Sequence, residues 1–288
     1  MNDNLRRYRA IKRALVQLYP SEPTSRLLQS LHVMAMFING IVASKSTHTR
    51  DVAKKTPTGA KVTSREKQLS RWYQNERVSY ERHMLPFVEA LLAGLASKTL
   101  VLAIDGSEVG SDSVRLMVSL IYQKRTIPLL LMVRAGRSGS CLRLHDPLFT
   151  RQAYGPVLVI LWWQTGYKEP VYLVTNLYVM EEACLWYRKR MRIETFFSDQ
   201  KSRGFHLHKS RIRDPQRLAR LMIAACFAYI WIIYLGTLCI QDGWVKHIHR
   251  TDRCDLSLFQ LGMDLLEYFL NEFLPIPVDF RLPVSSPT

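Results

Sequence analysis

An uncharged run of twenty residues, LMIAACFAYIWIIYLGTLCI at positions 221–240, constrains the fold of this chain more than any other feature. A run of this length can cross a membrane as a single helix. A helix that is apolar on every side can equally lie at the centre of a protein core. We favour the buried central helix, because a single-span protein would leave the basic chain on both sides of the run unexplained. The membrane span remains the alternative.

Composition favours a globular protein with a nucleic-acid partner. The chain has 288 residues, 48% of them hydrophobic, which is enough for a core and for two domains. Its net charge of +16 calls for a polyanionic partner, most often nucleic acid, although charge alone does not choose among DNA, RNA and a membrane surface. The five cysteines are scattered without a CxxC pair, so neither a disulfide framework nor a zinc site is indicated. Because we find no secretory signal, we expect a cytoplasmic protein.

The pattern of apolar residues divides the chain into a helical part and an α/β part. Residues 1–95 show helical spacing, and the basic, aromatic stretch within them suits DNA docking, with a solvated helical bundle as the equal alternative. From residue 99, three runs rich in Val, Ile and Leu predict an antiparallel meander. Two more strand candidates, PVLVILWW and PVYLVTNL, follow, and the chain is predicted to be helical from Glu181 to about Leu270.

A predicted helix from near Glu181 to near Gly204 carries four polar residues on one face. They are Tyr187, Arg190, Glu194 and Lys201. At about 100° per residue, the last three lie within about 60° of the first around the helix axis. A carboxylate beside two cations and a phenol can hold a metal ion while its neighbours bind phosphates. The alternative is a surface helix with intrahelical ion pairs, since Arg190 and Glu194 are four residues apart.

The run that contains these residues, YRKRMRIETFFSDQK, resembles the Tyr-x2-Arg-x3-Glu-x6-Lys signature of the insertion-sequence-four family of DDE transposases. The next run, KSRGFHLHKSRIRDPQRLARLMIAACFAY, is similar to the segment that follows the signature in that family. The resemblance covers residues from about 99 to 270. It implies a ribonuclease H-like α/β domain with a mixed sheet and flanking helices, in which the apolar helix is buried beside the sheet.

The resemblance also implies how the chain is divided and what it does. We expect an all-helical DNA-binding region at 1–95, a ribonuclease H-like transposase domain at 96–275 and a tail at 276–288. The implied activity is cut-and-paste transposition of an insertion sequence, in which element ends are cleaved and joined to target DNA. Mg²⁺ or Mn²⁺ is the implied cofactor. A homodimer is expected on the DNA, because the family pairs two element ends.

Members of the family place three carboxylates around two divalent cations, which activate the attacking oxygen and stabilise the departing one. Asp105, predicted to end the first strand, corresponds to the first carboxylate and is followed by Ser107, although an Asp-Gly pair after a strand is by itself a turn signal. Glu194 corresponds to the third carboxylate. Phosphates at the element ends are implied to be positioned by the other signature residues, Tyr187, Arg190 and Lys201.

The middle carboxylate of the family is absent from its expected place. Between Asp112 and Asp199 the only aspartate is Asp146, about ten residues after the third strand, which is too close for a crossover helix and a strand. We therefore expect that a block between about Ser138 and Pro147 has been lost and that cleavage is much reduced or absent. Two alternatives remain open. Asp146 itself could be the ligand, or the chain is a non-catalytic remnant that binds element ends and represses transposition.

Overall fold

In a computed structural model, the fold is described for residues 2–95, 100–109, 113–123, 125–135, 158–162, 171–175, 177–250 and 254–281. The helices are α1 (Asp3–Val16), α2 (Ser25–Ser44), α3 (Thr49–Lys55), α4 (Val62–Gln74), α5 (Tyr80–His83), α6 (Leu85–Ala93), α7 (Met180–Arg190), α8 (Arg192–Ser198), α9 (Pro215–Gln241), α10 (Val245–Ile248) and α11 (Leu258–Asn271). The strands are β1 (Leu102–Val109), β2 (Ser113–Tyr122), β3 (Arg125–Ala135), β4 (Leu158–Trp162) and β5 (Val171–Thr175). A π-helix (Asp199–Arg203) and a short 3-10 helix (Leu207–Ser210) link α8 to α9.

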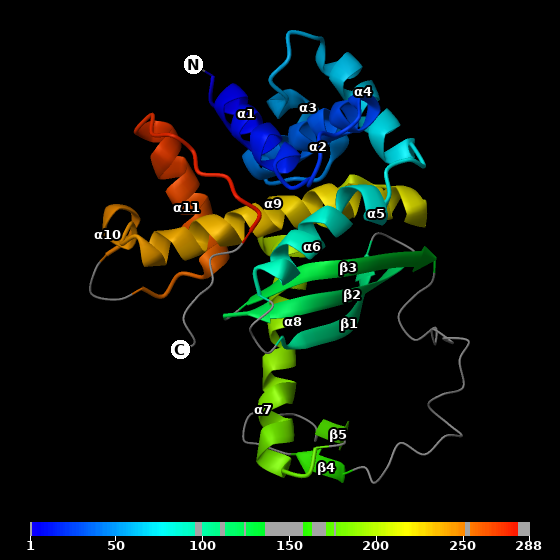
Figure 1. Cartoon of the computed structure of the whole chain (residues 1–288), viewed down its shortest axis with the longest axis vertical. Helices are drawn as coiled ribbons and strands as arrows, with labels where there is room; N and C mark the ends of the chain where they lie inside the picture. The colour runs from blue at the N-terminus through cyan, green and yellow to red at the C-terminus, as the bar shows by residue number, and fades with distance from the viewer. Residues whose placement is uncertain are drawn as a thin grey trace.

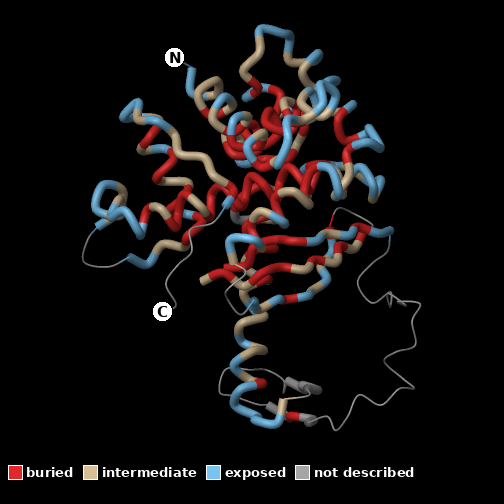
Figure 2. Tube along the Cα trace, viewed as in Figure 1, coloured by how far each residue is buried: buried red, intermediate tan, exposed pale blue. Residues whose placement is uncertain are grey.

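Helix α9 runs through the middle of the molecule, with α1 to α4 on one side and the sheet of β1 to β3 on the other (Figure 1). It begins where Asp214 accepts a hydrogen bond from the amide of Arg217 and where Pro215 takes the first helical position. Helices α2, α4, α5 and α11 and strand β3 pack against it. Most of its residues are buried (Figure 2). α9 is therefore the buried central helix that the apolar run favoured.

Two described helices, α2 and α9, are long and apolar enough to cross a membrane by length and composition. Protein covers much of both, since 61% of the apolar window of α2 and 83% of that of α9 are buried. Of the two, only α9 contains an uncharged run of twenty residues, whereas polar residues such as Asn39 interrupt the apolar run of α2. Asn39 of α2 is bonded inside the protein: it accepts from Arg7 and donates to the carbonyl oxygen of Lys55.

Helices α9 and α11 cross with their main chains in contact. A β-carbon on Gly236 of α9 would overlap the carbonyl oxygen of Leu258. A β-carbon on Gly262 of α11 would likewise overlap the carbonyl oxygen of Ile232. The two glycines thus allow α11 to lie directly on α9, with Leu265 buried between them.

The strands predicted from the sequence form two antiparallel sheets. β1, β2 and β3 make a meander in that order, with a bulge between Val118 and Ser119. β4 and β5 pair with each other. The meander and the two later strands are thereby confirmed. The described strands all pair antiparallel, so they do not form the mixed sheet that the resemblance implies, and the ribonuclease H-like fold stays a prediction.

The first strand is longer than predicted, and Asp105 lies in its middle rather than at its end. β1 continues to Val109 because its residues keep pairing with β2, as Ser107 does with Arg115 and Val109 with Ser113. Cross-strand pairing here overrides the turn preference of Asp-Gly. Since side chains alternate along a strand, Asp105 and Ser107 share the more buried face of β1.

One hydrophobic core links the N-terminal helices to the sheet. Buried side chains of α2, α6, α9 and β3 belong to the same cluster, among them Phe37 and Ile127. Phe87 of α6 and Phe227 of α9 meet with 5.4 Å between their ring centres. Packing is therefore continuous across residue 95, and the division of the chain at residues 95 and 275 stays a prediction.

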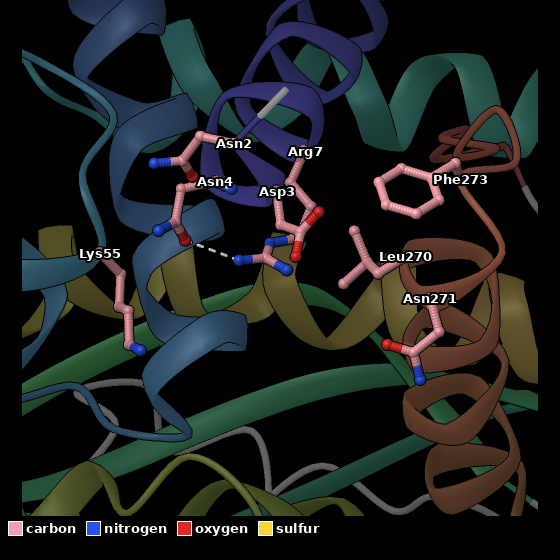
Figure 3. Close-up of a pocket in the computed structure, with 8 residues that line it drawn as sticks. All are labelled: Asn2, Asp3, Asn4, Arg7, Lys55, Leu270, Asn271 and Phe273. Atoms are coloured by element: carbon pink, nitrogen blue, oxygen red, sulfur yellow. Dashed lines mark hydrogen bonds between the residues drawn. The ribbon is translucent and has the colours of Figure 1, made fainter.

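Several arginines use their donors inside the fold. Arg6 donates to three carbonyl oxygens at the end of α11. Arg7 lines a cleft of about 630 Å³ between α1, α3 and α11 (Figure 3), where it donates to Asn4 and Asn39. Arg220 of α9 donates to two carbonyl oxygens at the end of α4 and just beyond it. Part of the +16 charge is thus engaged in holding helices together.

His83 is held neutral in the N-terminal core. Its Nε2 lies 2.8 Å from Ser30 Oγ, and its Nδ1 lies 3.2 Å from the carbonyl oxygen of Ser79. The carbonyl oxygen of Ser79 can only accept, so the proton of the neutral ring resides on Nδ1, and the Ser30 hydroxyl, which accepts from Trp72 Nε1, donates to Nε2. Burial lowers the pKa of His83 to about 4.

Replacing His83 by Gln should reduce the acid sensitivity of the fold. Because the pKa of His83 is lower in the folded than in the unfolded chain, stability falls as pH drops from about 6.5 toward 4. The slope is at most about 1.4 kcal/mol per pH unit. Urea unfolding at pH 7 and pH 5 measures it, and the stability difference between the two pH values should shrink in His83→Gln. An unchanged difference would contradict a neutral buried His83.

Gly262→Ala should destabilise the protein by about 3 kcal/mol, because the added methyl group forces α11 away from α9. The free energy of unfolding in urea is the measurement. Gly59→Ala is the control, since a β-carbon there has no neighbour within 4 Å, and its effect should stay within about 0.5 kcal/mol. A Gly262→Ala variant as stable as the wild type would show that the two main chains do not touch.

Candidate active site

Asp105 and Glu194 lie beside each other where β1 meets α8. Helix α8 packs against β1, and the Asp105 side chain is only 13% exposed. The pKa of Glu194 is raised, first by burial and then by the contact and charge of Asp105. The two carboxylates predicted from separate sequence patterns are therefore neighbours in the fold.

The two oxygens of Asp105 have different surroundings. Oδ1 accepts a hydrogen bond from the amide of Gly106 at 2.9 Å and forms an ion pair with Nη2 of Arg190, also at 2.9 Å. Oδ2 is buried and accepts no hydrogen bond from the described residues. A buried acceptor oxygen without a donor, next to a second carboxylate, is suited to a cation.

Arg190 contacts both Tyr187 and the carboxylate of Asp105. Its guanidinium lies 5.8 Å from the ring centre of Tyr187, one helical turn earlier, while Nη2 holds Asp105. The charge of Arg190 also acts on Glu194, where it opposes the rise in pKa. Arg190 and Glu194 therefore both lie at Asp105, and Tyr187 adjoins the guanidinium of Arg190.

Lys201 forms a hydrogen bond with β1, the strand that carries Asp105. Its Nζ donates to Ser107 Oγ at 2.7 Å, and Ser107 shares the face of β1 with Asp105. Burial lowers the pKa of Lys201, and the charge of Arg115 lowers it further, while Glu194 acts in the opposite direction. The last signature residue thus reaches the same site as the first three.

The segment that carries the signature is not the single regular helix that was predicted. α7 ends before Met191, α8 follows it, and the π-helix continues from Asp199 to Arg203. Gly204 then ends the segment, where a β-carbon would overlap the carbonyl oxygen of Asp199. Periodicity could not reveal the π-helix, because its residues are bonded to strands that are distant in the sequence.

Two buried arginines beneath the site were missed by sequence reasoning. Arg115 of β2 has its guanidinium 4.1 Å from the ring centre of Phe197 and donates to Gln200 at 2.9 Å. Arg125, the first residue of β3, pairs with Asp199 at 2.7 Å. A usable signal existed in the run VRLMVSLIY, where a charged residue stands among apolar ones. Such a residue must find a partner when the strand is buried.

The described residues contain no group of three or more His, Cys, Asp or Glu side chains that could hold a metal ion. Asp146 and the block from Ser138 to Pro147 lie outside the described residues. Asp105 and Glu194 nonetheless fit a divalent cation, because carboxylate oxygens are the ligands that Mg²⁺ and Mn²⁺ prefer and Asp105 Oδ2 has no donor within the described chain. They would supply part of its coordination.

Residues 34–231 match the family described as "Transposase DDE domain". The chain belongs to this family. The match begins inside α2 and ends inside α9, so the DDE transposase domain includes N-terminal helices as well as the sheet and the signature segment. No curated protein matches the chain, and no solved structure matches it.

Removing either carboxylate should weaken binding of a divalent cation by the transposase. Asp105→Asn and Glu194→Gln each remove one anionic ligand, so the Kd for Mn²⁺ should rise by about tenfold or more. Electron paramagnetic resonance of free Mn²⁺ measures it. Glu181→Gln, exposed in the first turn of α7, is the matched control and should bind like the wild type. Equal Kd values for all four proteins would place the cation elsewhere.

Proposed function

We propose that this DDE transposase acts at the ends of an insertion sequence in the manner of the insertion-sequence-four family. The observation that carries the proposal is one site built from two carboxylates and two cations, Asp105, Glu194, Arg190 and Lys201. A DNA strand at such a site finds cations for its phosphate oxygens and carboxylates that suit a metal ion. These features support cut-and-paste transposition, with cleavage of the element ends and transfer to target DNA.

In this proposal, Arg190 and Lys201 bind phosphate oxygens at the element end. Both are already oriented, Arg190 by Asp105 and the Tyr187 ring, and Lys201 by Ser107. Prior orientation lowers the entropy lost when the DNA binds. The phenol of Tyr187 adds a neutral hydrogen-bonding group one turn before Arg190.

Asp105 and Glu194 would hold Mg²⁺ or Mn²⁺. Such a cation, when bound, supplies activation of the attacking oxygen and stabilisation of the departing one. The chain itself holds the two carboxylates together: the charges of Arg190 and Lys201 offset the repulsion that Glu194 experiences from Asp105. We further propose a ribonuclease H-like catalytic domain, a homodimer on the DNA and a cytoplasmic location.

The helical part of the chain is proposed to contact DNA as well. Several cations on α3 and α4 are exposed, in contrast to Arg6, Arg7 and Arg65, whose donors are used within the fold. Exposed lysines and arginines bind the phosphate backbone without regard to sequence. The exposed cations in question are Lys54, Lys55, Lys67 and Arg71.

We also propose that strand cleavage is impaired in this chain. Two of the three family carboxylates are at hand in Asp105 and Glu194, and no third one joins them within the described residues. A site with fewer ligands binds its cation more weakly and positions the attacking water less well. The same observation favours the second candidate, a non-catalytic protein that occupies element ends and represses transposition, because that role needs only the phosphate-binding residues.

Arg190→Ala and Lys201→Ala should each weaken binding to a fluorescent DNA duplex that carries an end of the element encoding the chain. Each change removes one phosphate contact, so Kd should rise by about tenfold and the slope of log Kd against log salt should fall by about one. Fluorescence anisotropy at several salt concentrations measures both. Lys246→Ala, an exposed cation of α10, is the control and should bind normally. Unchanged binding by both signature variants would overturn the phosphate role.

The same duplex tests catalysis when Mg²⁺ is added. We expect bound DNA with little strand cleavage, and Asp105→Asn provides the blank for contaminating nucleases. Efficient cleavage that Asp105→Asn abolishes would overturn the impairment while upholding the assignment of Asp105. It would mean that Asp105 and Glu194 suffice for cleavage or that a further ligand joins them.

A further inference from the structure

Three consecutive residues of the π-helix bond three different strands. Asp199 pairs with Arg125 of β3 at 2.7 Å, and Gln200 accepts a hydrogen bond from Arg115 of β2 at 2.9 Å. Lys201 then donates to Ser107 of β1 at 2.7 Å. The π-helix therefore crosses the sheet from β3 to β1, with one bond to each strand.

An α-helix is poorly suited to making these bonds at successive residues. Its side chains point about 100° apart, so three in a row turn away from any one surface. A π-helix has more residues per turn, which narrows that angle. The amide of Gly204 donates the π-type bond to the carbonyl oxygen of Asp199, and the amide of Phe205 donates to the same oxygen at 3.0 Å. Residue 204 is glycine because a β-carbon there would meet that oxygen.

Arg115 would lower the stability of the fold compared with an apolar residue at the same position. It is completely buried, and its Nε and Nη2 have no hydrogen-bond partner among the described residues. Buried donors without acceptors reduce stability, and an apolar side chain stacked on Phe197 would fill the space without burying a charge. What an apolar side chain would lose is the bond to Gln200, the residue next to Lys201.

We infer that Arg115 and Arg125 are positioning residues, which hold Gln200 and Asp199 on β2 and β3 so that Lys201 is placed on β1 beside Asp105. The bond to Ser107 orients the Lys201 side chain, but that bond alone does not fix the main chain of residue 201 relative to the sheet. When Asp199 and Gln200 are held by the two arginines, the main chain of Lys201 is fixed in position relative to the sheet. The inference rests on the proposed function in one respect, namely that Lys201 binds a DNA phosphate.

Hydrogen exchange tests, without DNA, whether Arg115 and Arg125 hold the π-helix on the sheet, an arrangement that we call the clamp. In Arg115→Met, amides of residues 200–205 should exchange about tenfold faster than in the wild type, while peptides of α11 keep their rates. Unchanged exchange at 200–205 would overturn the inference, and so would equal acceleration in α11, which signals a general loss of stability.

The variants Gln200→Leu and Gln200→Glu provide a second exchange experiment, since only the glutamate can still accept a hydrogen bond from Arg115. Exchange should accelerate in the first and stay near wild type in the second, and equal rates in the two would count against the clamp.

A double-mutant cycle tests the consequence for DNA. Arg115→Met should weaken binding of the element-end duplex by about tenfold in the wild-type background and by less than about twofold in Lys201→Ala. The same factor in both backgrounds would mean that Arg115 acts through general structure and not through Lys201. If Lys201→Ala binds like the wild type, the proposed phosphate role fails, and the exchange experiment alone decides whether the clamp exists.

Discussion

At the crossing of α9 and α11 the main chains touch, because Gly236 and Gly262 carry no β-carbon. α11 thereby covers one part of α9, while the N-terminal helices and β3 cover the rest. A helix that is apolar on every side needs protein around its whole circumference, or apolar surface meets water. The signature segment leads into α9 through the short 3-10 helix, so the placement of α9 fixes where that segment meets the sheet.

The features of the fold that the sequence predicted are those with local or periodic causes. The apolar run predicted α9, and runs rich in Val and Ile predicted the meander and the β4–β5 strands. The features it missed have distant causes. Asp105 lies in mid-strand because β2 keeps pairing with β1 beyond it. The helical spacing of α2 was predicted, but the sequence could not show that its polar residue Asn39 is buried and bonded to Arg7 and Lys55.

For the candidate site, the sequence predicted the residues but not their partners. Spacing along the signature brought Arg190 and Glu194 to one side of the segment, and the strand pattern supplied Asp105. That Arg190 holds Asp105 could not be predicted, because the pair joins a helix to a strand 85 positions earlier in the chain. Arg115 and Arg125 were not predicted for a related reason. A strand is recognised by its apolar residues, and the partners of these two arginines, Gln200 and Asp199, lie in the distant π-helix.

The ion pair between Arg190 and Asp105 limits how the site can work. Arg190 uses Oδ1 of Asp105, and Oδ2 remains on the side without a donor, so a cation at Oδ2 and the arginine at Oδ1 can be held together. A guanidinium has several N–H donors in one plane, so pairing with Asp105 orients Arg190 without exhausting it. Lys201 likewise spends one donor on Ser107 and keeps others. The phosphate binding that we propose therefore requires neither cation to leave its partner, and on that proposal it would persist in a chain whose cleavage chemistry is impaired.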